Sequence, residues 1–251
     1  MSAIKQVAMP VMDLANPSRF LILVERVLPW LAAVTVCVLA VGLYQALLVA
    51  PDDYQQGATV KIMFIHVPSA WLAMFCWAVM SVAALGTLVW RHPLADVAAK
   101  AAAPLGAAFT FLCLLTGSLW GRPMWGAYWV WDGRLTSVLV LFLMYLAVLA
   151  LWRTVEDPSR AARAVAILTL VGAVNLPIIK FSVDWWATLH QPASVLRMGA
   201  PTIHSSILVP LLIMGVAFML LFLTLHLAAM RNEILRRRVR TLRLMQAQAG
   251  A

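Results

Sequence analysis

The segment LTSVLVLFLMYLAVLALW, from Leu135 to Trp152, holds 18 residues, none with a charged side chain. A helix of about 20 apolar residues is long enough to span the hydrocarbon core of a bilayer. Similar apolar runs occur near residues 27–49, 64–90, 98–119, 164–182 and 205–229. Lipid offers no partners for backbone N–H and C=O groups, so each run must satisfy them internally as a helix. The sequence therefore predicts an all-α membrane protein, with six transmembrane helices in a single polytopic domain over residues 1–251.

The overall composition agrees with this prediction. Hydrophobic residues make up 63% of the chain and charged residues 12%, with a mean hydropathy of +0.89. Soluble domains carry roughly 25% charged residues. The alternating pattern of a membrane barrel is absent from the sequence. No GxxxxGK[ST] phosphate loop occurs either, so we do not expect the chain itself to hydrolyse ATP.

The net charge of +9 is unevenly shared between the two sides of the membrane. If both termini are cytoplasmic, 14 of the 19 Lys and Arg residues fall on inner segments. The outer five are Lys61, Arg122, Arg134, Lys180 and Arg197. Cytoplasmic loops are enriched in Lys and Arg, which favours this orientation over a nucleic-acid-binding function. The basic tail, residues 230–251, would then be cytoplasmic, either as a frayed topology anchor or lying on the inner membrane face.

A tryptophan-rich segment, WGRPMWGAYWVWDGR from Trp120 to Arg134, directly precedes the fourth predicted helix. It should form a periplasmic loop between helices three and four. Tryptophan collects at membrane interfaces, so one interpretation is a simple interfacial belt. The other is a platform for a flat apolar ligand, whose charged edges would meet Arg122 and Arg134. The four tryptophans are Trp120, Trp125, Trp129 and Trp131.

Asp132 and the histidines supply the polar groups near this segment. Asp132 is placed to cap the fourth helix, and it could also hold Arg134 or a tryptophan N–H. His66, His190 and His204 fall on the predicted outer face. A lone histidine at a helix end is usually structural, but two near a tryptophan platform suit the axial positions of haem iron. Haem propionates would suit Arg122, Arg134 or Arg197.

The fifth apolar run carries two local signals. Pro177 removes one backbone donor inside the run, which predicts a kink in the helix. After it, Phe181, Trp185 and Leu189 follow an i, i+4, i+8 spacing, which predicts a short interfacial helix beside His190.

These segments resemble those of a known family. WGRPMWGAYWVWDGRLTS is similar to the "WWD" signature of haem-handling membrane proteins in cytochrome c biogenesis. The further segments PDDYQQG (51–57), FIHVPSAW (64–71), NLPIIKFSVDWW (175–186) and TLHQ (188–191) resemble the haem exporter protein C family, CcmC. The resemblance implies transient binding of b-type haem at the periplasmic face of a bacterial inner membrane. It implies His66 and His190 as axial ligands, and a WWD surface formed by Trp120, Trp125, Trp129, Trp131 and Asp132. Ala187 departs from the family pattern, which suggests a more polar residue.

The same resemblance implies a set of partners. Haem would pass to a periplasmic haem chaperone of the CcmE type, within an ABC-type complex. That complex would contain a separate ATPase, a second membrane subunit and a small membrane protein (CcmA, CcmB and CcmD types). The chain itself would not be an enzyme. One alternative is a solute permease, which the nearly charge-free span centres disfavour. A haem lyase is the other, but the sequence shows no evident covalent catalyst and is short for such a protein.

Overall fold

The computed structural model describes residues 16–186, 188–195 and 197–249. The described chain contains six helical segments that are long and apolar enough to cross a membrane, which confirms the predicted fold class. Their bounds are Pro17–Val49, Ala58–Leu88, Ala95–Trp125, Gly133–Thr154, Pro158–Trp185 and Ser205–Ala249. The helices within them are α1 (Pro17–Tyr44), η2 (Gln45–Val49), η3 (Ala58–Ile62), α2 (Met63–Leu88), α3 (Ala95–Trp125), α4 (Gly133–Thr154), α5 (Pro158–Gly172), α6 (Asn175–Trp185) and α7 (Ser205–Ala249).

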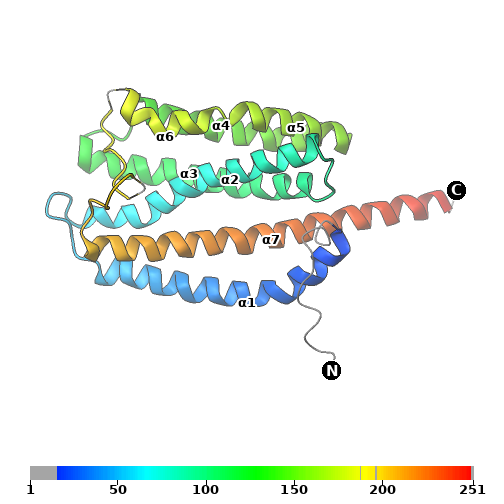
Figure 1. Ribbon diagram of the computed structural model, residues 1–251, viewed down its shortest axis with the longest axis horizontal. Coiled ribbons are helices and arrows are strands. Elements are labelled where there is room, and N and C mark those ends of the chain that lie inside the picture. The colour runs from blue at the N-terminus through cyan, green and yellow to red at the C-terminus, as the bar shows by residue number, and fades with distance from the viewer. Residues whose placement is uncertain (1–15, 187, 196, 250–251) are drawn as a thin grey trace.

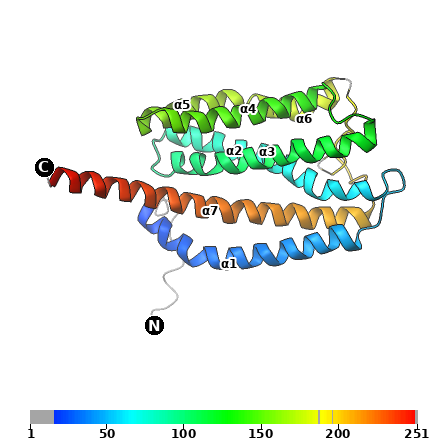
Figure 2. The same ribbon diagram turned by 180° about the vertical axis from the view of Figure 1, so that it is seen from behind.

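The helices form an elongated bundle with two distinct ends (Figures 1 and 2). Helices α1 and α7 lie side by side along one flank, and α4, α5 and α6 form the opposite flank. Helices α2 and α3 lie between them. The first and last described residues lie at one end, the tail end, while the connections α1–α2, α3–α4 and α6–α7 lie at the other, the loop end.

Buried polar side chains tie the central helix α2 to its neighbours. Trp77 is fully buried, and its Nε1 donates a hydrogen bond to the carbonyl of Thr169 on α5 at 3.0 Å. The Tyr145 hydroxyl on α4 donates to the carbonyl of Ala73 at 2.8 Å, and its ring meets Trp77 edge-on at 4.8 Å. Buried polar groups are costly unless they are paired, so these bonds fix how α2, α4 and α5 pack together.

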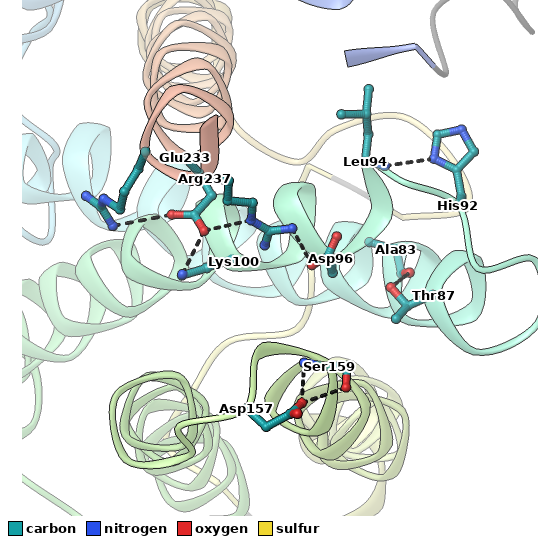
Figure 3. A network of polar contacts seen from close by, with 11 residues as sticks. Ala83, Thr87, His92, Leu94, Asp96, Lys100, Asp157, Ser159, Glu233 and Arg237 are labelled. Atoms are coloured by element: carbon teal, nitrogen blue, oxygen red, sulfur yellow. Dashed lines mark hydrogen bonds and ion pairs between the residues drawn. The ribbon is translucent and has the colours of Figure 1, made fainter. Parts of the chain in front are cut away.

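An ionic network joins α3 to α7 at the tail end (Figure 3). The carboxylate of Glu233, which is buried, accepts hydrogen bonds from Lys100 Nζ at 2.8 Å and Arg237 Nε at 3.0 Å. Arg237 also pairs with Asp96 at 2.7 Å. A buried carboxylate needs such partners to offset its lost hydration. The network therefore holds α7 against α3 where the apolar part of α7 ends.

Beyond this network the basic tail continues as helix. Residues 230–249 belong to α7, which projects past the other helices at the tail end (Figure 1). The described tail is therefore helical and not frayed, whereas its location on the inner membrane face stays a prediction. The physical reason is composition, because the tail is rich in Arg, Leu, Gln and Ala and holds no Gly or Pro up to residue 249. Its last two residues, 250–251, lie outside the described part.

The fifth predicted span consists of two helices, α5 and α6, which are separated at Ala173 and Val174. Pro177 has no N–H with which to bond the carbonyl of Ala173, four residues earlier. The N–H of Leu176 bonds that carbonyl instead, at 3.1 Å. The predicted kink is thus confirmed, and it lies one turn before the proline. Asn175 bridges the break by donating from Nδ2 to the carbonyl of Ser137 on α4 at 2.9 Å.

Two helix boundaries at the loop end differ from the sequence prediction. Helix α3 does not end near residue 119 but continues to Trp125, where Gly126 adopts φ 76° and ends the helix. Helix α6 ends at Trp185, so Leu189 lies outside any helix and the predicted interfacial helix is wrong in its second half. The reason is Trp186, which is extended and packs its indole ring against Gly133.

Candidate functional site

Trp120 and Trp125 lie on the last two turns of α3, so half of the predicted tryptophan loop is helical. Trp120 Nε1 donates a hydrogen bond to Gln56 Oε1 at 3.0 Å. Gln56 is held in a tight turn, since its N–H donates to Asp53 Oδ1 at 2.9 Å. The PDDYQQG segment therefore acts as a support for the first tryptophan. Sequence reasoning missed Gln56, because nothing in the spacing connects it with Trp120.

His66 lies in the first turn of α2 and faces α3. Its Nδ1 is 3.1 Å from both the carbonyl of Cys113 and the hydroxyl of Thr116. The Thr116 hydroxyl already donates to the carbonyl of Leu112 at 2.6 Å. Both neighbours must therefore accept from His66, which places the proton on Nδ1. The Nε2 atom keeps its lone pair, the form in which imidazole binds metals.

Gly117 makes room for the His66 imidazole. A Cβ atom at position 117 would lie 2.8 Å from His66 Cε1, closer than real Cβ atoms approach other heavy atoms. Glycine normally weakens a helix interior by about 1 kcal/mol relative to alanine. The close approach of the imidazole explains why glycine occupies this position in α3.

Asp132 connects α4 to the segment after α6. Its Oδ1 accepts the N–H of Leu135 at 2.7 Å, which confirms the predicted N-cap of α4. Its Oδ2 accepts hydrogen bonds from His190 Nδ1 at 3.0 Å and from the hydroxyl of Thr188. The backbone N–H of His190 donates back to Thr188 Oγ1 at 3.1 Å. Asp132 thus has a second role, but its partner is His190 and not Arg134.

The charge states in this group follow from its surroundings. Burial raises the pKa of Asp132, but hydrogen bonds from Thr188, Leu135 and His190 outweigh burial and hold this pKa below its usual value. Burial lowers the pKa of His190 despite the opposing charge of Asp132. At neutral pH the pair is therefore a carboxylate beside a neutral imidazole with its proton on Nδ1. His190 Nε2, like His66 Nε2, keeps its lone pair.

The two imidazoles and the first two tryptophans come together at the loop end. His66 meets Trp120 at a ring-centroid distance of 5.7 Å, and His190 meets Trp125 at 4.8 Å, both edge-on. Both tryptophans belong to the last two turns of α3, so both imidazoles lie at the loop end. No cluster of three or more His, Cys, Asp or Glu suited to a metal ion occurs among the described residues. Two neutral histidines beside aromatic rings can supply two axial ligands to a metal that is already held in a macrocycle.

Trp129 and Trp131 lie in the short loop between α3 and α4. Their rings meet edge-on at 5.4 Å. Trp131 is 75% exposed, whereas Trp129 Nε1 is buried without a hydrogen-bond partner within residues 16–186, 188–195 and 197–249. A buried unpaired donor is uncommon in a native protein, and this N–H can donate a hydrogen bond to a ligand at the loop.

The two predicted arginines also lie beside this loop. Arg122 donates to the carbonyl of Gly126 and lies over the ring of Tyr128 at 5.6 Å. Arg134 donates from Nε to Ser182 Oγ at 3.3 Å and from Nη2 to the carbonyl of Lys180 at 3.4 Å. Arg134 is thus directed toward α6.

The other histidines lie outside this group. His204 accepts at the start of α7, with its Nδ1 2.8 Å from Ser206 Oγ. His226 stacks on Phe222 at 5.1 Å inside α7, and His92 caps the turn before α3 at the tail end. Ala187, the departure noted in the sequence, lies outside the described residues.

Fold and site together define a multi-pass helical membrane protein with two histidines and a tryptophan surface at one end. A family model described as "Heme exporter protein C" matches residues 10–245. The protein of that name from Bradyrhizobium diazoefficiens is 78% identical, over 97% of this chain and 92% of the relative. Those from Escherichia coli K12 and Haemophilus influenzae are 48% and 46% identical, over 89% and 83% of this chain and 90% and 85% of the relatives.

The chain therefore belongs to the haem exporter protein C family. With six membrane-spanning segments and bacterial relatives, it is a multi-pass protein of the bacterial inner membrane.

Proposed function

We propose that this protein binds b-type haem transiently at its loop end and delivers it to a periplasmic haem chaperone of the CcmE type. One observation carries the proposal. His66 and His190 each commit Nδ1 to the protein, so both Nε2 atoms are available as axial ligands, with a tryptophan ring beside each. Family membership supports the haem-handling role.

The surroundings suit the rest of a haem group. The porphyrin is a flat apolar disc, which the tryptophan rings can contact, and the unpaired Trp129 Nε1 offers a donor. Arg122 and Arg134 can attract the anionic propionates. The three cysteines form no CxxCH sequence, so the haem would be held without a thioether bond.

This function requires other subunits. The sequence lacks a phosphate-binding loop, so ATP hydrolysis belongs to a separate subunit of the ABC-type complex. A second membrane subunit and a small membrane protein, of the CcmB and CcmD types, complete the proposed assembly. In this proposal the protein is not an enzyme, because it binds haem and passes it on chemically unchanged.

The test is the absorbance spectrum of the purified protein with added haem. We expect a bis-histidine haem spectrum, and we expect haem to move to the purified chaperone when the two are mixed. A protein that shows no haem band under any condition would favour the permease alternative.

The orientation of the loop end can be tested with reporter fusions. The charge distribution predicts that a reporter active only in the periplasm is active after Gly126 and inactive after Asp157 or at the C-terminus. The reverse pattern would place the haem site on the cytoplasmic side and contradict delivery to a periplasmic chaperone.

The tryptophan platform makes a separate prediction. The double variant Trp125→Phe and Trp129→Phe should weaken haem retention roughly tenfold or more. Phenylalanine lacks the indole N–H and offers a smaller ring, and each such loss should cost on the order of 1 kcal/mol. Haem retained on gel filtration, per protein, measures the effect. Trp30→Phe is the matched control, since Trp30 is 78% exposed on α1. Equal retention by both variants would reduce the segment to an interfacial belt.

A further inference from the structure

His66 and His190 differ in the partners that hold them. The Nδ1–H of His190 donates to a carboxylate, Asp132 Oδ2, at 3.0 Å. The Nδ1–H of His66 is shared between two neutral acceptors, the Cys113 carbonyl and the Thr116 hydroxyl, each at 3.1 Å. Hydrogen bonds to charged acceptors are roughly twice as strong as those between neutral groups. The two candidate ligands are therefore unequal.

The Asp132 carboxylate is itself firmly placed. Its Oδ1 caps α4 through Leu135, and its Oδ2 also accepts from the Thr188 hydroxyl. Asp132 is buried, so water screens its charge little. A buried carboxylate that accepts from a metal-bound histidine orients the ring and raises its basicity as a ligand.

From this asymmetry we propose that Asp132 is a positioning residue that makes His190 the stronger iron ligand, so that His66 is the ligand that yields first when haem leaves. The inference rests on the proposed function. It adds an order of release. Haem would first detach from His66 on α2 and would still be bound to His190, in the segment that follows α6.

The physical consequence concerns the oxidation state of the iron. A more basic ligand stabilises ferric iron more than ferrous iron, because ferric iron carries the larger positive charge. Asp132 should therefore lower the reduction potential of bound haem, and the neutral partners of His66 should do so less.

The first test compares two near-isosteric variants of the full-length protein loaded with haem. Asp132→Asn keeps an acceptor for the α4 cap but removes the charge beside His190. We expect its ferric preference to fall about tenfold, a rise in potential of about 59 mV for one electron. Thr116→Val removes one neutral partner of His66 and should raise the potential by less than half as much. Equal shifts, or no shift in Asp132→Asn, would overturn the proposal.

The second test needs no change at Asp132. Carbon monoxide binds reduced haem by replacing one axial ligand. The proposal expects the wild-type carbon monoxide spectrum to match that of His66→Ala, in which His190 is the remaining ligand. A match to His190→Ala would overturn it.

The two kinds of failure are distinguishable. If the proposed function is wrong, the wild-type protein shows no bis-histidine haem spectrum. If only the release order is wrong, that spectrum is present, but the variants or the carbon monoxide complex give one of the contrary results.

Discussion

Replacing either His66 or His190 with alanine is expected to reduce haem affinity at least a hundredfold. Loss of a hydrogen-bonding partner outside the ligand set typically costs 10- to 100-fold in metal affinity, and loss of a ligand itself should cost more. The retained haem per protein, from the absorbance of the purified variants, measures the loss. Added imidazole should restore part of the bis-imidazole spectrum, because it can occupy the vacated position.

The controls for this experiment are His92→Ala and His226→Ala. His92 lies at the tail end and His226 stacks on Phe222 inside α7, so neither contacts the proposed site. Both should retain wild-type haem spectra. Wild-type spectra from His66→Ala and His190→Ala as well would mean that the iron has other ligands.

Gly117→Ala should disrupt haem binding by adding a single methyl group. The new Cβ would lie 2.8 Å from His66 Cε1, so the imidazole must move away from its Cys113 and Thr116 partners. We expect haem affinity to fall by at least tenfold. Helix α3 should remain intact, since alanine favours helix over glycine by about 1 kcal/mol.

The matched control is Leu115→Ala, a residue on the same helix that is 45% exposed. Circular dichroism should show equal helix content in both variants, and a haem titration should separate them. Wild-type affinity in Gly117→Ala would show that His66 does not need its observed position to bind iron.

Local sequence patterns were enough to predict the spans, the Asp132 cap and the Pro177 kink. Each depends on residues that are close together in the chain. An apolar run spans the membrane whatever it packs against, and an N-cap acts on N–H groups two or three residues ahead. The length of α3 was missed because Gly121 and Pro123 in WGRPMW suggest a loop, whereas both fit within its last turns.

Contacts between distant parts of the chain could not be predicted in this way. The Asp132–His190 hydrogen bond joins residues 58 positions apart, and Gln56 and Trp120 are 64 apart. Asp132 was therefore expected to hold Arg134 or a nearby tryptophan N–H, because the sequence shows only near neighbours. Likewise, the role of Gly117 depends on how closely α2 approaches α3, which no spacing within α3 reveals.

The order of the site residues along the chain also has a consequence during protein synthesis. His66 lies 124 residues before His190, and the tryptophans and Asp132 lie between them. At about 5–20 residues per second, a ribosome needs roughly 6–25 s to add that stretch. During this time the nascent chain carries one ligand and most of the aromatic surface, but not the second histidine. An unfinished chain should therefore hold haem weakly, and full binding should begin only after the segment that follows α6 has been made.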